Sequence, residues 1–194
     1  MSSSASSDVS PWPEKSTRLA GEYPIFKIRT DVKTSPRTGK DHDFYVVECH
    51  DWVNVIALTA DEELVMVKQF RHGSGTVELE IPGGVMDPED VSPVATAVRE
   101  LREETGYEGK NARLIGGVFP NPAIMNNTCR TVLIGECELK HPLEQDQGED
   151  LVTEVVPLSA IRGAVASGRI SHALVIVGLY YFDLDRAGQP RCSS

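Results

Sequence analysis

The chain has 194 residues, with 29 acidic against 19 basic side chains and a formal net charge of -10. A protein that binds nucleic acids in general needs a basic surface, so this balance argues against that class of partner. No apolar run approaches the ~20 residues that a membrane-spanning helix requires, and the N-terminus lacks the basic and apolar pattern of an export signal. The four cysteines show no paired spacing, which favours free thiols in a reducing cytoplasm over a disulfide framework.

The N-terminal part of the chain is expected to form a tail and a hairpin. Residues 1–20 are rich in serine and include two prolines, which is typical of a flexible segment. Residues 25–32 alternate in polarity like a strand, residues 35–39 contain turn formers, and residues 44–49 resume the strand pattern. Residues 21–50 are therefore predicted to fold as an N-terminal β-hairpin, which we expect to serve in dimerisation.

The main body is expected to occupy residues 51–188, followed by a short tail over residues 189–194. Its predicted strands and helices show no internal repeats. The second of three predicted helices is closed by Gly168, and the third is capped by Ser171 and runs to Phe182. Strands are predicted over residues 52–59, 64–70, 76–81, 112–119, 131–139 and 151–156.

The segment from Arg99 to Tyr107, with the sequence RELREETGY, carries the strongest chemical signal. Glu100, Glu103 and Glu104 stand at positions i, i+3 and i+4, so they share one side of a helix, ~130° from its apolar stripe. Like charges this close repel, and a hard cation such as Mg²⁺ would relieve the repulsion. A solvated acidic face balanced by nearby arginines is the other interpretation, and it is the more common one for charge runs. The apolar stripe comprises Val94, Ala97, Val98, Leu101 and Thr105.

The flanks of this helix favour the cation-binding interpretation. A strand runs into the Gly83-Gly84 turn upstream, and a glycine stops the helix downstream. This combination resembles the Nudix box of the Nudix hydrolases, whose pattern is G-x5-E-x7-R-E-U-x-E-E-x-G-U, where U is a bulky aliphatic residue. The second half matches, except that tyrosine fills the final aliphatic place. In the first half the spacing is one residue longer and Val91 replaces the glutamate, so Glu89 or Asp90 can supply that charge through a one-residue bulge.

The resemblance implies an α/β fold, namely a Nudix-type α/β/α sandwich with a mixed β-sheet and the N-terminal β-hairpin as an extension. It implies that Glu100 and Glu104, together with a main-chain carbonyl near Gly83, bind Mg²⁺, for which Mn²⁺ can substitute. Glu103 lies on the same helix face and is expected to assist catalysis, either by coordinating through water or by positioning a partner. The resemblance also implies a homodimer built partly by the hairpin.

Residues outside the helix narrow the substrate class. Pro122, sixteen residues after Gly106, and the stretch Gln69-Phe70-Arg71 resemble the ADP-ribose pyrophosphatase branch of the family. In that branch the arginine lies near the substrate phosphates, a task that suits its planar, bidentate guanidinium group. Asn121 and Asn126 are further candidates for bonds to ribose, sugar hydroxyls or phosphate. A polar turn that satisfies its own backbone is the other interpretation of these asparagines.

Hydrolysis also needs a base that accepts a proton from water. ADP-ribose pyrophosphatases carry two acidic residues, spaced two apart, in the corresponding loop. Here Gln147 and Glu149 occupy those places, so Glu149 is the expected base or a further metal ligand, with Asp146 and Glu144 as alternatives. The predicted activity is hydrolysis of the pyrophosphate bond of ADP-ribose or a related nucleoside diphosphate sugar. The alternatives are a non-catalytic sensor of such a nucleotide, or a pyrophosphatase that prefers GDP-mannose or NADH.

Overall fold

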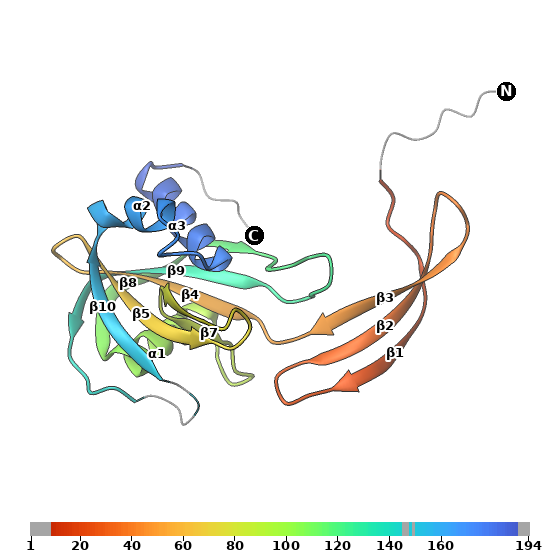
Figure 1. Cartoon of the computed structure of the whole chain (residues 1–194), viewed down its shortest axis with the longest axis horizontal. Helices are drawn as coiled ribbons and strands as arrows, with labels where there is room; N and C mark the ends of the chain where they lie inside the picture. The colour runs from red at the N-terminus through yellow and green to blue at the C-terminus, as the bar shows by residue number, and fades with distance from the viewer. Residues whose placement is uncertain (1–8, 145–147, 149, 190–194) are drawn as a thin grey trace. The chain divides into compact units, whose positions relative to one another are not determined.

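The computed structural model of the chain describes residues 9–144, 148 and 150–189, and the chain forms two compact units (Figure 1). Each unit has a sheet of its own, with three strands in the first unit and seven strands in the second. The three helices of the described part of the chain all belong to the second unit. The first unit comprises Met1–Cys49 and Asn121–Asn127, and the second comprises His50–Pro120 and Thr128–Ser194.

The first unit is built on an antiparallel sheet. Its strands, in spatial order, are β1 (Glu14–Glu22), β2 (Lys27–Thr34) and β3 (Asp41–Glu48). The later segment of this unit extends the sheet, because Val47 of β3 pairs with Met125 in a parallel bridge. The amide of Val47 donates a hydrogen bond to the carbonyl of Ile124 at 2.7 Å. The predicted hairpin, β2 and β3, is therefore the middle of a larger sheet.

Strand β1 corrects the prediction that residues 1–20 form a flexible tail. Residues 14–20 lie in this strand, where polar side chains bind partners across the sheet. Thr17 donates a hydrogen bond to Asp31 at 2.6 Å, and Lys15 forms an ion pair with Asp41. Cross-strand pairs of this kind stabilise a strand that has no apolar alternation, so the hydrophobic pattern did not reveal it. Residues 1–8 lie outside the described residues.

Asp31 is a fully buried carboxylate at the centre of this sheet. It accepts hydrogen bonds from Thr17 Oγ1 at 2.6 Å and from Arg29 Nε at 3.0 Å, and Lys33 Nζ lies 3.6 Å away. Burial alone would raise the pKa of Asp31, but these hydrogen bonds and the charges of Arg29 and Lys33 hold the pKa below its usual value. The carboxylate therefore stabilises the folded sheet while it is ionised.

The second unit contains a mixed sheet, as predicted. Its strands are β4 (Trp52–Leu58), β5 (Glu63–Arg71), β6 (Thr76–Glu80), β7 (Gly83–Val85), β8 (Tyr107–Val118), β9 (Cys129–Leu139) and β10 (Leu151–Pro157). The order is β10-β5-β4-β9-β8, with β6 paired to β5 and β7 paired to β4. Strands β4 and β9 run parallel, whereas the other pairs are antiparallel.

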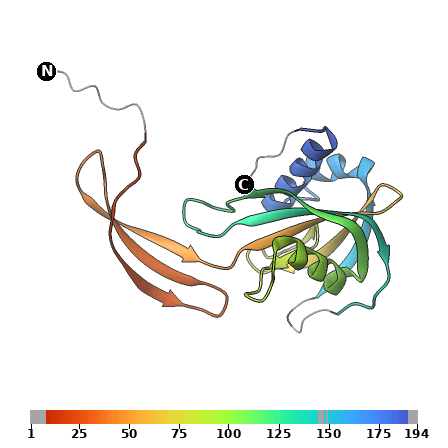
Figure 2. The same ribbon diagram turned by 180° about the vertical axis from the view of Figure 1, so that it is seen from behind.

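Helices cover both faces of this sheet, which confirms the α/β/α sandwich (Figures 1 and 2). The helices are α1 (Pro93–Thr105) on one face, and α2 (Leu158–Ala166) and α3 (Ala173–Arg186) on the other. Leu101 of α1 packs in one core with Val55, and Phe182 of α3 packs in the other core with Ile56. Because successive residues of a strand point to opposite faces, adjacent residues of β4 supply both cores.

Helix α3 differs from its prediction at both ends. The residue at its N-cap makes no side-chain capping bond, and the predicted cap, Ser171, instead donates its hydroxyl to Glu78 at 2.6 Å. The helix continues beyond Phe182, where its last turn is held to β8 by a bidentate pair. Arg113 donates to both carboxylate oxygens of Asp185 at 2.6 Å. This long-range contact has no local signal in the sequence.

Asp31→Asn is expected to destabilise the first unit by ~1–3 kcal/mol, because a buried, charge-assisted hydrogen-bond network is weakened. The folded-state pKa of Asp31 lies below its unfolded value of about 4. Its contribution is therefore present above the unfolded pKa and is lost as pH falls through the folded pKa. Hydrogen exchange of β1 and β2 amides, corrected for intrinsic rates, measures this loss.

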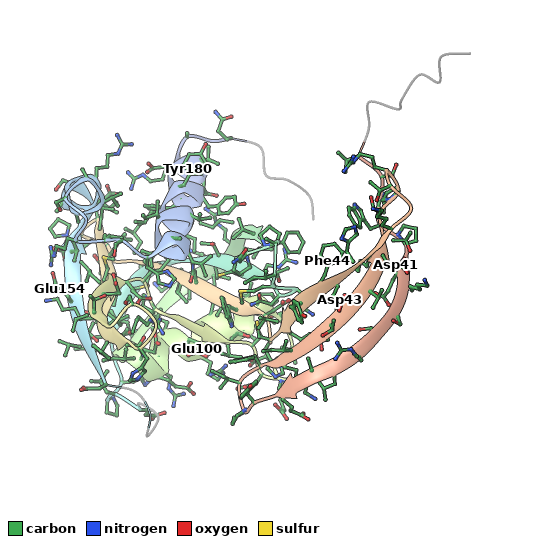
Figure 3. The ribbon with its side chains drawn as sticks, turned by 45° about the vertical axis from the view of Figure 1, so that its right-hand side comes forward. Asp41, Asp43, Phe44, Glu100, Glu154 and Tyr180 are labelled. Carbon is green, nitrogen blue, oxygen red and sulfur yellow. The ribbon has the colours of Figure 1, made fainter. Side chains whose placement is uncertain are left out.

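The matched control is Asp43→Asn, at an exposed position of β3 that Figure 3 labels. We expect its amide protection to follow that of the unchanged protein at every pH. Equal losses of protection in both variants would contradict the role assigned to Asp31.

Candidate active site

Helix α1 begins and ends at residues that suit helix termini. Ser92 is the N-cap, and its side chain accepts a hydrogen bond from the amide of Ala95 at 3.2 Å. Pro93 occupies the first turn, where its missing N–H costs nothing. Gly106 ends the helix with φ of 72°, a left-handed conformation that glycine adopts without strain, and its amide donates to the carbonyl of Arg102. These caps fix where the acidic face of the helix lies.

The buried face of α1 includes carboxylates that the sequence analysis placed to one side of the apolar stripe. Val98, predicted to be buried, is 44% exposed, whereas Glu100 and Glu104 are buried beside Leu101. Figure 3 shows Glu100 on this helix within the second unit. A pattern based on apolar residues alone therefore misplaced the centre of the buried face.

Two glycines at β7 make room for these carboxylates. Gly83 donates its amide to Glu104 Oε2 at 3.0 Å. A Cβ atom at Gly84 would lie 2.5 Å from the carboxylate carbon of Glu100, and one at Gly83 would lie 2.2 Å from the carbonyl oxygen of Val53. Both separations are shorter than a van der Waals contact. At Gly83 the neighbour is backbone, so glycine is required there, whereas at Gly84 the neighbour is the end of the Glu100 side chain, which a larger residue would displace.

Arg99 is the cation at the centre of the site. Its Nη1 lies 3.0 Å from Glu100 and 3.0 Å from Glu103, and its Nη2 lies 3.0 Å from Asp90 and 3.5 Å from Asp87. Burial alone would lower the pKa of Arg99, but the hydrogen bond to Asp90 and the charge of Glu100 raise it above its usual value. One positive charge faces four carboxylates here, so the group carries a surplus of negative charge.

Asp90 supplies the acidic group that the box pattern lacks at Val91. Its Oδ2 accepts hydrogen bonds from Arg99 Nη2 and from the amide of Asp87, both at 3.0 Å. The hydrogen bond from Arg99 is the main reason that the pKa of Asp90 is lowered, although burial opposes the shift. Glu89, the other candidate, is exposed. The longer loop thus still provides a carboxylate for Arg99.

The donor atoms of this site fit a hard divalent cation by their chemistry. Such cations prefer oxygen ligands, and Glu100, Glu103 and Glu104 offer carboxylate oxygens where negative charge is in surplus. Within the described residues, no group of three or more His, Cys, Asp or Glu side chains is arranged to hold a metal ion. Arg99 is paired with Glu100 and Glu103, and the amide of Gly83 donates a hydrogen bond to Glu104.

Arg71 and Gln69 lie near the end of β5. Arg71 Nε and Nη2 donate to the two carboxylate oxygens of Glu80 at 2.7 and 2.9 Å. Glu80 is 3% exposed, and a carboxylate buried to that extent needs a charged partner. The side chain of Arg71 remains 42% exposed, so a ligand can reach it. Gln69 stands opposite Glu78 in the β5–β6 pair.

Asn121 and Asn126 belong to the first unit. The carbonyl of Asn121 accepts hydrogen bonds from the amides of Ile124 and Met125 at 3.1 and 2.8 Å, and the amide of Asn126 donates to Val47 at 3.3 Å. The segment thus forms a turn that satisfies part of its own backbone. A role of either asparagine in substrate binding stays a prediction.

The acids predicted to take part in catalysis, as the base or as its assistant, are only partly described. Glu149 and Asp146 lie outside the described residues. Glu144, the remaining alternative, is ion-paired with Arg102 at 3.0 Å. Glu103 is paired with Arg99, as described above, and its side chain is 35% exposed. The amide of Glu144 donates to the carbonyl of Glu103 at 3.1 Å, so both of these acids lie at the C-terminal half of α1.

Glu80 and Gly84 have roles that the sequence analysis did not assign. The pairing of Glu80 with Arg71 does have a signal in the sequence. Glu80 ends a strand that leads into the core, a buried carboxylate there needs a cation, and Arg71 is on the paired strand. A glycine that faces a helical carboxylate leaves no such signal. Its role follows only from the distance between Gly84 and Glu100.

Comparison with known protein families identifies a NUDIX domain over residues 49–175 of the chain. The chain belongs to the Nudix family. It is a Nudix hydrolase, and Nudix hydrolases generally use divalent metal ions. In the described part of this Nudix hydrolase, no helix is both long enough and apolar enough to cross a membrane.

Curated relatives and a solved structure resemble this Nudix hydrolase. It is 38% identical over 114 residues to the ADP-sugar pyrophosphatase of Mus musculus, a match that spans 57% of this chain and half (50%) of the mouse protein. It is 30% identical over 152 residues to the ADP-ribose pyrophosphatase of Bacillus subtilis (strain 168), covering 78% of this chain and 82% of that protein. The crystal structure of an ADP compounds hydrolase matches 95% of this chain and 100% of its own with a TM-score of 0.81. Its sequence identity is 18%, so this last match shows the common fold.

Replacing Asp90 tests whether this residue braces Arg99. We expect Asp90→Asn to lower the free energy of unfolding by ~1–3 kcal/mol, because it weakens the hydrogen bonds to Arg99 and to the amide of Asp87. Denaturant unfolding followed by circular dichroism measures the change. Glu89→Gln, at the exposed neighbouring position, is the control, and the assignment is wrong if both variants are destabilised equally.

Gly84→Ala tests the close approach of the glycine turn to Glu100. The added Cβ would lie 2.5 Å from the carboxylate and displace it, so we expect the rate of hydrolysis to fall by about a hundredfold while the fold is kept. Steady-state kinetics and circular dichroism measure the two quantities. Gly163→Ala in α2 is the control, since a Cβ there meets nothing within 4 Å. Full activity of Gly84→Ala would show that the position of Glu100 does not matter.

Proposed function

We propose that this Nudix hydrolase cleaves the pyrophosphate bond of ADP-ribose or a related nucleoside diphosphate sugar, with Mg²⁺ as its metal ion and Mn²⁺ able to substitute. The observation that carries the proposal is the pair of buried carboxylates, Glu100 and Glu104, packed against a glycine turn. Relatives named ADP-sugar and ADP-ribose pyrophosphatase support the substrate class. The products are a nucleoside monophosphate and a sugar phosphate, which are AMP and ribose 5-phosphate for ADP-ribose.

In this proposal Glu100, Glu104 and the main-chain carbonyl of Gly83 hold the metal, and Glu103 assists them. A bound divalent ion neutralises the diphosphate and makes a water molecule more acidic. The oxygen of a water molecule forms a bond to one phosphorus, the bond from that phosphorus to the bridging oxygen breaks, and a carboxylate takes the water proton. The protein contributes mainly by positioning these groups and by compensating charge.

Arg71 is the proposed phosphate-binding residue. Its guanidinium group is fixed in direction by Glu80 and stays partly exposed, which supports a role in gripping phosphate oxygens of the substrate. Gln69 lies two residues earlier on the same strand and is proposed to bind beside it. Asn121 and Asn126 are proposed to bond ribose, sugar hydroxyls or phosphate, because the loop that contains them resembles the corresponding loop of Nudix nucleotide-sugar hydrolases.

The test of the function is product analysis with Mg²⁺ against ADP-ribose, GDP-mannose, UDP-glucose, NADH, diadenosine polyphosphates and 8-oxo-dGTP. We expect the highest kcat/KM for ADP-ribose or another nucleoside diphosphate sugar. Glu104→Gln serves as the inactive control, with kcat lowered by at least ~100-fold and the fold intact. A higher kcat/KM for 8-oxo-dGTP or the dinucleoside polyphosphates would overturn the substrate class.

The same assay separates the enzyme from a sensor that binds the nucleotide without cleaving it. A sensor has no need of buried carboxylates at the metal site, whereas Glu100 and Glu104 are both present and both buried. Tight binding of ADP-ribose with no product at any Mg²⁺ or Mn²⁺ concentration would favour the sensor. Preferred cleavage of GDP-mannose or NADH would keep the pyrophosphatase and change its substrate.

Glu149 is proposed as the base. Glu149→Gln is expected to lower kcat strongly with little change in KM, and to flatten the acidic limb of the kcat–pH profile, because an amide cannot accept the proton. Glu144 forms only an exposed ion pair with Arg102, which is weak, so Glu144 stays an alternative that the experiment must test. Initial rates across pH for Glu149→Gln, Glu144→Gln and Asp146→Asn measure the effect. If Glu149→Gln alone keeps nearly full rate, the base lies elsewhere in this loop.

We also propose that the chain forms a homodimer through its first unit. Leu19 and Phe44 share one face of the three-stranded sheet and are 58% and 39% exposed. Trp12 packs edge-on against Phe44, with 5.4 Å between ring centroids, and is itself 38% exposed. These exposed apolar side chains lie on the face that also carries Arg29 and Asp31, and a mixture of aromatic, aliphatic and charged groups is compatible with a surface that binds a second copy of the chain.

Sedimentation velocity tests the dimer. Leu19→Lys is expected to shift the protein towards the monomer, because it places a charge on the shared face. Tyr45→Ser is the matched control, since Tyr45 is 60% exposed but lies on the opposite face of the sheet. A monomeric unchanged protein at micromolar concentration would overturn the proposal.

A cytoplasmic location is proposed from the cysteines. Cys129 and Cys137 are buried free thiols, and burial raises their pKa to about 12 and about 11. Their burial keeps these thiols protonated and unreactive, and it is the lack of any disulfide among the described cysteines that agrees with a reducing compartment. Imaging of a fluorescent fusion tests this, and its accumulation in an oxidising compartment would contradict it.

A further inference from the structure

The carboxylate of Glu78 on β6 is held by three hydroxyl groups. Ser171 and Thr76 each donate to it at 2.6 Å, and Ser74 donates at 3.2 Å. These hydrogen bonds, with that from Ser171 first, lower the pKa of Glu78. Ser74 and Thr76 come from the β5–β6 turn, whereas Ser171 directly precedes α3. One carboxylate thus gathers donors from two distant parts of the second unit.

Glu78 and Glu80 both lie on the face of the sheet that carries Arg71, so either carboxylate is a possible partner for its guanidinium group. In the β5–β6 register, Arg71 stands opposite Thr76, Gln69 opposite Glu78, and Val67 opposite Glu80. Alternate residues of paired strands share a face, so Arg71, Glu78 and Glu80 all lie on one face. Counted along β6 from the residue opposite Arg71, Glu78 is two residues away and Glu80 is four, or ~7 and ~13 Å at the usual strand rise.

Arg71 nevertheless reaches the more distant carboxylate. Its Nε and Nη2 both bond Glu80, while Glu78 has the three hydroxyl groups as its partners. Burial gives Glu80 a strong need for a cation, because it is 3% exposed. Glu78 is less buried, and hydroxyl donors are enough for it. The two acids therefore divide the available donors, with the charged donor going to the buried acid.

We infer that the three hydroxyl donors act as a positioning group for Arg71: they occupy Glu78, the nearer but competing carboxylate, and so leave the guanidinium group to bind Glu80 beside the proposed phosphate site. The inference rests on the proposed function, in which Arg71 binds substrate phosphates. If the hydroxyls are lost, Glu78 becomes a competing acceptor and draws Arg71 along β6, away from the glycine turn that follows Glu80. Arg71 would remain bound to Glu80 in a fraction of the molecules, so the expected effect on substrate binding is moderate.

The first test removes the two shortest hydrogen bonds to Glu78 with the double variant Thr76→Val/Ser171→Ala. Valine keeps the shape of threonine, so the strand is preserved. We expect KM for ADP-ribose to rise by ~3–10-fold while kcat stays within about twofold, because binding is altered and the carboxylate site is not. The side-chain Nε–H signal of Arg71, assigned by its loss in Arg71→Lys, is expected to shift in the NMR spectrum.

The second test is rescue. Adding Glu78→Gln to the double variant removes the competing charge, so KM and the Arg71 signal are expected to return to those of the unchanged protein. Glu78→Gln alone is the matched control and should leave both near their original values, because Arg71 is already bound to Glu80. A merely structural role of Glu78 predicts the opposite, namely that removing it adds to the damage.

Two outcomes would overturn the inference. One is a double variant with unchanged KM and an unchanged Arg71 signal. The other is a raised KM that Glu78→Gln does not restore. Failure of the proposed function looks different, since the unchanged protein would then not cleave ADP-ribose at all. The NMR signal of Arg71 and its rescue by Glu78→Gln still decide the inference in that case.

Discussion

The acidic side of helix α1 depends on a single guanidinium group. Arg99 faces four carboxylates at 3.0 to 3.5 Å, two from the preceding loop and two from its own helix. One cation cannot balance four anions, so the group is stable only if water or further cations share the charge. Folding here therefore preserves an electrostatic imbalance, and that imbalance is what makes the helix suitable for binding a cation. The loop, the helix and the turn at β7 are all arranged around it.

A second arginine, Arg71, neutralises a buried carboxylate on the paired strands β5 and β6. Glu80 is as deeply buried as Glu104, but it is compensated fully by the bidentate pair with Arg71. The bidentate pair fixes Arg71, whereas on α1 a single guanidinium group is shared by several carboxylates, and these are the groups proposed to bind the metal ion. The protein thus treats two kinds of buried acid differently. One serves as an anchor for a positive side chain, and the others remain acceptors.

Much of this arrangement follows from local sequence signals, and the remainder depends on contacts between distant residues. The α1 helix, its glycine stop and the mixed sheet were predicted correctly, because periodicity and caps act over a few residues. The burial of Glu100 was missed, since hydropathy patterns treat a carboxylate as exposed. Whether Glu89 or Asp90 pairs with Arg99 depends on the loop path, which spacing alone does not determine. Strand β1 was missed because its partners are polar and distant in sequence.

The chain enters the first unit twice, and this limits how the protein can be shortened. Met125 pairs with Val47, and the carbonyl of Ile124 and the amide of Asn126 both bond Val47. Deleting residues 1–49 would therefore remove the partner of the Asn121–Asn127 segment. The carbonyl of Ile124 and the amide of Asn126 would then lose their hydrogen bonds to Val47. The first unit is made of two separate segments of the chain, so a single truncation cannot remove it. A shortened enzyme without the first unit therefore needs two deletions, one of residues 1–49 and one of the Asn121–Asn127 segment, with a new loop that joins β8 to β9.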